Sequence, residues 1–164
     1  MRFDLNVGIG EWFPFVQSEI KPDGEVKYSD PETDENGNIT AGRVQLRIAD
    51  ADTLESIQSQ TRKREVEHVF NPKTRQMERL PYFEQTPAQE KKERELIWDY
   101  AIMDWEDKEP FLNPDGTPIA RTVDNKLRLM NIPVFARFVG RCLQMISGAT
   151  NEAKVAAEKN LSHG

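Results

Sequence analysis

Alternation of apolar and polar residues predicts a strand over residues 43–49, "RVQLRIA". Every second side chain there is apolar, which is typical of an antiparallel strand with one buried and one solvated face. Residues 11–17, "EWFPFVQ", have the aromatic content of a strand, but Pro14 has no backbone N–H to donate. We therefore expect a small sheet in the N-terminal half, with residues 11–17 at its edge.

Turn signals predict hairpins on both sides of this strand. The polar segment 18–41 contains an Asp-Gly pair at 23–24 and an Asn-Gly pair at 36–37, and such pairs favour tight turns. Residues 64–80 are expected to form a further hairpin around Asn71-Pro72-Lys73-Thr74, because a proline at the second turn position presets the backbone angle.

Two capping patterns predict helix starts. Asp52, followed by Glu55 three residues later, indicates a short helix over about 53–62, because this pair satisfies free backbone N–H groups of a first turn. Thr86 and Gln89 form a second pair, and apolar residues then recur at helical spacing as far as Trp105. The second pattern predicts a helix over 87–105.

Two more helices complete the expected fold. One begins at Thr122, and the other begins at Pro133 and is expected to end at Gly148. The result is an α+β fold, in which a small antiparallel sheet with hairpins in the N-terminal half packs on a C-terminal group of three to four helices. We expect a single domain over residues 1–148 and a flexible C-terminal tail over 149–164, because the tail has little to bury, with helical extension of the tail as the alternative.

Composition narrows the function classes. The net charge is −6, with 37% apolar and 30% charged residues, which indicates a globular chain and argues against a nucleic-acid-binding surface. No segment approaches the ~18 apolar residues of a membrane helix, and the N-terminus has no apolar signal core. Cys142 is the only cysteine and is expected to be a small buried hydrophobe. These features predict a cytosolic protein.

One segment resembles a calcium-binding loop. In "ETDENGNITAGR", Glu32, Asp34 and Asn36 precede Gly37 at the spacing of calcium ligands. The twelfth position, which should carry a bidentate glutamate, is Arg43 and places a positive charge where the ion's shell would close. A polar hairpin loop is the preferred interpretation, and no metal site is expected.

The acidic connector "DWEDKEPFLNPDGTPIART", residues 104–122, raises the question of a catalytic or metal site. Asp104, Glu106 and Asp107 are expected on different sides of a helix end, and no histidine lies near them in sequence. Prolines and Asp115-Gly116 indicate a solvated turn. A solvated connector is the preferred interpretation, although carboxylates that converge in three dimensions stay an alternative.

Other routes to catalysis lack their residues. His68 is expected as an exposed cross-strand residue, and Cys142 belongs to an apolar stripe. The sequence contains no G-x-S-x-G motif, no glycine-rich phosphate loop and no paired Cys or His metal spacing. The prediction is therefore a non-enzyme without a cofactor.

Large apolar residues near the connector are the candidates for partner binding. Phe111 and Leu112 lie outside any periodic element, so they either fold back as a plug in the core or stay available to a partner. The candidate partner-binding residues are Trp105, Phe111, Leu112, Leu129 and Met130.

Residues 95–144 resemble a family of tail assembly chaperones from long-tailed bacteriophages and prophages. In that family a helix ending in a D-W pair leads to a D-G-x-P turn, then to an E-N-K-like start and an F-A-R-F helix. The matching residues here are Asp104-Trp105, Asp115 to Pro118, Asp124 to Lys126 and Phe135 to Phe138. The pieces "EWFPF", "GRVQLRIADADTLESI" and "AEKN" also resemble the family, so the resemblance runs over most of the chain.

This resemblance implies a non-enzymatic assembly factor in the host cytoplasm, which holds the tape measure protein soluble and works with other tail proteins. Nucleic acid and membrane are not expected as partners. Two alternatives remain: a structural tail component retained in the virion, and a small acidic inhibitor of a host protein.

Overall fold

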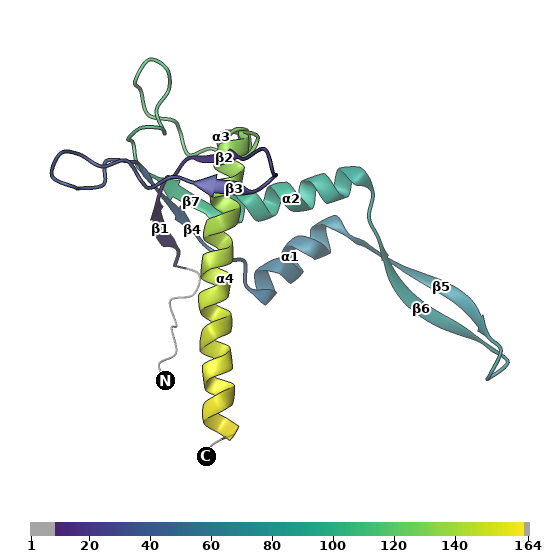
Figure 1. The fold of residues 1–164 in the computed structure, drawn as a ribbon. Helices are drawn as coiled ribbons and strands as arrows, with labels where there is room; N and C mark the ends of the chain where they lie inside the picture. The colour runs from purple at the N-terminus through teal and green to yellow at the C-terminus, as the bar shows by residue number, and fades with distance from the viewer. Residues whose placement is uncertain (1–8, 163–164) are drawn as a thin grey trace. The chain divides into compact units, whose positions relative to one another are not determined.

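The computed structural model describes the backbone of residues 9–162 and the side chains of 9–62, 68–80 and 84–148 (Figure 1). Residue contacts group the chain into two compact units, one made of Met1–Ala49 and Trp98–Gly164 and the other of Asp50–Ile97. The sheets and helices form the α+β fold expected from the sequence. The single domain over residues 1–148 stays a prediction.

A three-stranded antiparallel sheet organises the first unit. Its order is β1 (Glu11–Pro14), β4 (Arg43–Leu46) and β7 (Ile102–Trp105). The alternation in β4 is confirmed, since Val44 and Leu46 are fully buried, but the strand ends at Leu46 and does not continue to residue 49 as predicted. The edge position of β1 is confirmed too, and it accommodates the missing N–H of Pro14.

Two small turns between β1 and β4 confirm the turn signals. Strands β2 (Ser18–Ile20) and β3 (Val26–Tyr28) form a hairpin whose turn contains Gly24 at a φ of 87°. A bridge between Thr33 and Ile39 closes the second turn, where Gly37 has a φ of 80°. Both angles lie in the left-handed region that glycine adopts without a steric penalty.

The calcium-like segment is a hairpin loop. Oδ1 of Asp34 accepts the backbone N–H groups of Asn36 and Asn38, each at 2.9 Å. The carboxylate therefore holds its own turn, as aspartate commonly does in such loops.

The predicted helix over 87–105 is wrong in its last turn. Helix α2 (Pro87–Ala101) begins as expected, but the chain continues as strand β7 from Ile102. Ile102 pairs with Leu46 and Trp105 with Val44, with a register shift between them that leaves one extra residue in β7. Because of this bulge, Ile102 and Trp105 are both buried although they lie three residues apart in a strand.

Helices α3 (Val123–Met130) and α4 (Pro133–Ser162) begin where the sequence predicts. The predicted end of the last helix at Gly148 is wrong, because α4 continues to Ser162. A glycine inside a helix costs only ~1 kcal/mol relative to alanine, and it ends a helix only when its backbone turns left-handed. The residues predicted as a tail are thus helical as far as Ser162, and their flexibility stays a prediction.

The core of the first unit lies between the sheet and α4. It contains Val16, Val44, Leu46, Ile102, Trp105, Phe111, Met130, Phe135, Phe138, Val139 and Cys142. Cys142 is buried as expected, and burial raises the pKa of its thiol to about 12. A thiol with such a pKa is a poor nucleophile at neutral pH.

Arginines fasten α4 to the small β2–β3 hairpin. Arg137 Nε donates to Ser18 Oγ at 2.8 Å, and its Nη2 donates to the Ser18 carbonyl at 3.2 Å. The guanidinium of Arg141 lies 4.3 Å from the ring centroid of Tyr28. These contacts position α4 over the aromatic part of the core.

The second unit contains α1 (Ala51–Thr61), the hairpin of β5 (Lys63–Asn71) and β6 (Gln76–Glu84), and most of α2. The α1 cap is Asp50 rather than the predicted Asp52, because Asp50 Oδ1 accepts the Thr53 N–H at 2.7 Å. The Thr86 and Gln89 cap of α2 is confirmed by reciprocal hydrogen bonds of 2.8 and 3.2 Å.

A buried polar cluster joins α1 and α2 within the second unit. Glu93 is 8% exposed and forms an ion pair with Arg62 at 3.1 Å. Its other oxygen accepts the side-chain amide of Gln85 at 2.7 Å, and that amide also donates to the Thr61 carbonyl at 3.5 Å. Glu93 is therefore satisfied by two partners from different elements.

Two glycine substitutions should have opposite effects on the free energy of unfolding. A Cβ at Gly42 would lie 2.8 Å from Cδ2 of Phe111 and 3.0 Å from the Lys108 carbonyl, so Gly42→Ala should destabilise by about 1–3 kcal/mol. A Cβ at Gly140 would meet nothing within 4 Å in α4, so Gly140→Ala should stabilise by about 0.5–1 kcal/mol. Urea denaturation measures both. Equal effects would contradict the close approach at Gly42.

Candidate functional site

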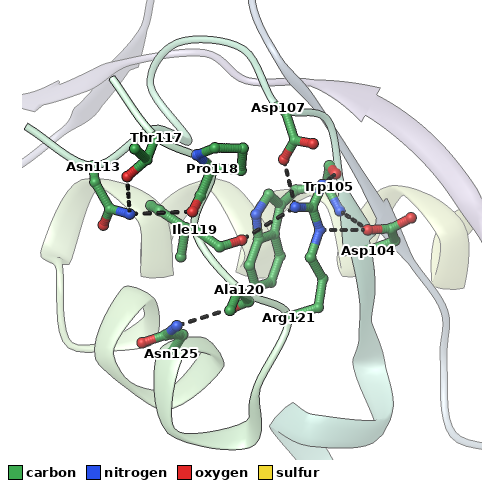
Figure 2. A network of polar contacts seen from close by, with 10 residues as sticks. All are labelled: Asp104, Trp105, Asp107, Asn113, Thr117, Pro118, Ile119, Ala120, Arg121 and Asn125. Atoms are coloured by element: carbon green, nitrogen blue, oxygen red, sulfur yellow. Dashed lines mark hydrogen bonds and ion pairs between the residues drawn. The ribbon is translucent and has the colours of Figure 1, made fainter. Parts of the chain in front are cut away.

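The acidic connector is held closed by Arg121, which comes from its far end (Figure 2). Arg121 Nε donates to Asp104 Oδ1 at 2.9 Å, and Nη1 forms an ion pair with Asp107. The guanidinium also donates to the backbone carbonyls of Trp105 and Ile119. Arg121, near the C-terminal end of the connector, thus binds the residues at its N-terminal end, where β7 ends.

Arg121 also covers the indole of Trp105. Its guanidinium carbon lies 5.2 Å from the ring centroid, within the range of a cation–π contact. Burial disfavours the charged guanidinium, but the hydrogen bonds that it donates to Asp107 and Asp104 outweigh that effect and raise the pKa of Arg121 above its ordinary value. Arg121 therefore stays charged and holds the carboxylates in place.

Glu106 ties the connector to the central strand. Arg43 donates to it from the backbone N–H at 2.8 Å, from Nε at 2.9 Å and from Nη2 at 3.3 Å. The hydrogen bonds from Arg43 lower the pKa of Glu106. Arg43, which occupies the position of the bidentate glutamate in the calcium-like segment, thus has a structural role at the start of β4.

The tip of the connector is a turn stabilised by its own side chains. Asp115 Oδ1 accepts the Thr117 backbone N–H at 3.1 Å and the Thr117 hydroxyl at 2.6 Å. The hydroxyl hydrogen bond is the main cause of the lowered pKa of Asp115. Asn113 donates across the turn to the Thr117 hydroxyl and the Pro118 carbonyl, each at 3.1 Å (Figure 2).

These contacts answer the question that the acidic connector raises. Asp104 and Asp107 do converge, contrary to the expectation that they lie on different sides of a helix end, but they converge on an arginine. Among the side chains that the structure describes, those of residues 9–62, 68–80 and 84–148, no group of three His, Cys, Asp or Glu is placed to hold a metal ion. The carboxylates of Asp104, Glu106, Asp107 and Asp115 thus have structural roles, and the absence of catalysis stays a prediction.

The sequence-predicted partner-binding residues are mostly covered by the fold. Trp105 and Phe111 are 1% exposed and Met130 is 8% exposed, whereas Leu112 and Leu129 are half-buried. Phe111 packs edge-to-face with Phe15 and Phe135. Of the two alternatives that the sequence left open for Phe111, the structure therefore shows the side chain folded back into the core. Partner binding by these residues stays a prediction, and only Leu112 and Leu129 offer appreciable surface.

Other apolar side chains are more exposed than the predicted site. Ile20 and Val26 face each other across the β2–β3 hairpin and are 61% and 36% exposed. Phe70 and Met77 are paired near the end of β5–β6 and are 56% and 60% exposed. The sequence indicates both hairpins by turn residues flanked by apolar residues. It does not indicate which faces of these hairpins stay exposed to solvent.

Comparison of the chain with models of known protein families, with curated proteins and with solved structures finds no match. Among the helices that the structure describes, none has the length and apolar character of a membrane span.

Acidification provides a test of the Arg43–Glu106 contact. Because the folded-state pKa of Glu106 is lowered, its contribution to stability is present above its unfolded pKa and is lost as pH falls through the folded pKa. Glu106→Gln should therefore be less stable than wild type at neutral pH, and the difference should shrink in acid. Urea denaturation from about pH 7 to about pH 2 measures this. A difference independent of pH would contradict a role for the Glu106 charge.

Proposed function

We propose that this chain is a non-enzymatic tail assembly chaperone of a long-tailed bacteriophage or prophage, which binds the tape measure protein and keeps it soluble in the host cytoplasm. The observation that carries the proposal is the resemblance of residues 95–144, together with the roles of the matching residues. Asp104 binds Arg121, Trp105 and Phe138 are buried in the core, and Asp115 holds a turn.

These roles support an assembly factor rather than an enzyme. A resemblance carried by scaffold residues implies a shared fold and no shared reaction. Four carboxylates of the connector are held by arginines or by the Thr117 hydroxyl, those of Asp104, Glu106, Asp107 and Asp115. The chain is thus proposed to act by contact alone.

The physical requirement is to cover apolar surface. A tape measure protein is a long helical chain whose exposed apolar stripes aggregate unless they are covered. This chain offers exposed apolar residues in the first unit, including Ile20, Ile132 and Met145, which are 61%, 50% and 48% exposed. Its net charge of −6 favours solubility of the complex.

Analysis of particles separates this proposal from its main alternative. A chaperone should be abundant in the lysate of producing cells and absent from purified virions, because it leaves when the tail tube assembles. Deletion of its gene should move the tape measure protein into the insoluble fraction. Recovery of this chain from purified virions in a fixed ratio to the tube protein would instead favour a structural tail component.

A further inference from the structure

The end of the β5–β6 hairpin, residues 68–80, is a two-stranded arm with apolar side chains on both faces. Its strands form a sheet of their own, so both are edge strands. The register places Phe70 opposite Met77 on one face, and these side chains are 56% and 60% exposed. On the other face, Val69 and Leu80 are 37% and 46% exposed. Isolated two-stranded hairpins are marginal in water, so such an arm gains stability from a partner.

The arm differs from the rest of the chain in charge. It carries Lys73, Arg75 and Arg79 against the single carboxylate of Glu78, which gives a charge of +2 with His68 neutral. The rest of the chain therefore carries a charge of −8, which together with the +2 of the arm gives the net charge of −6. Among the residues that the structure describes, the three cations form no ion pair, whereas Glu78 accepts the side-chain amide of Asn71 at 2.6 Å.

The cations and the apolar pair lie on the same part of the hairpin. Arg79 pairs with His68 two residues from the Phe70–Met77 pair, so these four residues share one face. Lys73 lies in the exposed turn. Arg75 has a φ of 54°, and its N–H donates to the Asn71 carbonyl at 2.8 Å, which closes the turn. The arm thus presents a basic rim around an apolar centre.

A complementary surface exists on the same chain. The acidic loop, residues 29–42, has four exposed carboxylates and no lysine or arginine. Its apolar member Ile39 is 50% exposed and is fixed by the bridge to Thr33. The carboxylates are Asp30, Glu32, Asp34 and Glu35.

We propose that the protein self-associates, with the basic apolar arm of one copy docked on the acidic loop of a second copy. A second copy is favoured over an unrelated protein because both halves of the complementary pair are present on one chain. Each copy carries one arm and one loop, so two copies together supply two arm–loop pairs, and a twofold axis is the commonest closed symmetry of oligomers. The apolar centre supplies burial, and the charges supply specificity and salt dependence. This proposal does not depend on the proposed function.

The test is sedimentation equilibrium of the full chain and of matched variants. Wild type should form a dimer that weakens at high salt. Phe70→Ser with Met77→Ser should raise the dissociation constant by about tenfold or more. The control pair Ile132→Ser with Met145→Ser removes apolar residues of similar exposure outside the arm and should leave the constant unchanged.

Charge reversal makes the test specific for the two surfaces. The arm variant Lys73→Glu with Arg75→Glu and the loop variant Asp30→Lys with Glu32→Lys should each be monomeric, and their mixture should form a dimer. Asp34 is left intact because it holds the turn of the loop. Circular dichroism melting checks folding, and Lys73→Glu alone serves if the double variant unfolds. A monomeric wild type, including one that binds polyglutamate or RNA through the arm, would overturn the proposal, as would failure of the mixture to associate.

Discussion

Replacing Phe111 by alanine is expected to lower the free energy of unfolding by about 3–5 kcal/mol, because the ring is fully buried and its removal leaves a cavity. The ring centroid lies 5.8 Å from that of Phe15 and 5.9 Å from that of Phe135. Both pairs are edge-to-face, an arrangement that adds ~0.5–1.5 kcal/mol beyond area burial. Urea denaturation followed by tryptophan fluorescence measures the loss.

The neighbouring residue provides the control for Phe111. Leu112 is half-buried, so Leu112→Ala should cost about 1 kcal/mol. The two substitutions also separate the two alternatives that the sequence left open for this segment. A small effect of Phe111→Ala, within about 0.5 kcal/mol, would mean that the ring is exposed in solution.

Replacing Glu93 by alanine should destabilise the second unit by about 2–3 kcal/mol. The substitution leaves Arg62 without its anionic partner, and Nε of Arg62 is already buried without a hydrogen-bond acceptor. Breaking a fully buried pair costs ~3–5 kcal/mol, and the expected value is smaller because the Arg62 side chain is 36% exposed. Hydrogen exchange of amides in residues 50–97 measures the loss of protection.

A second glutamate on the same helix is the matched control for Glu93. Glu95 pairs with Lys91 at 3.8 Å, and its side chain is 35% exposed. Glu95→Ala should therefore change stability by less than about 0.5 kcal/mol. Equal losses of protection in the two variants would show that the polar cluster around Glu93 stabilises the second unit no more than an exposed ion pair does.

Local signals in the sequence predict much of this fold. Hairpin turns at Gly24 and Gly37 follow from dipeptides with few alternative conformations, and the Thr86–Gln89 cap involves groups three residues apart. The alternation in β4 identifies its buried face directly. These features depend on neighbours in the chain, which a sequence shows.

Pairing between distant segments is what the sequence does not show. Residues 102–105 have the spacing of a helix, but pairing with β4, more than 50 residues earlier, makes them a strand. The connector presents the same problem, because Arg121 meets Asp104 across 17 residues and Glu106 meets Arg43 across 63. A list of acidic residues therefore suggests a site, and the partners that neutralise them appear only when the chain is folded.

The central claim is that this chain keeps a tape measure protein soluble by direct contact, and co-expression tests it most directly. A tape measure fragment that is insoluble when made alone is produced with this chain, with an unrelated soluble protein as the control. The account predicts that this chain moves most of the fragment into the soluble fraction and co-purifies with it, whereas the control protein does neither. A fragment that stays in the pellet beside abundant, folded wild-type protein would contradict the proposed function.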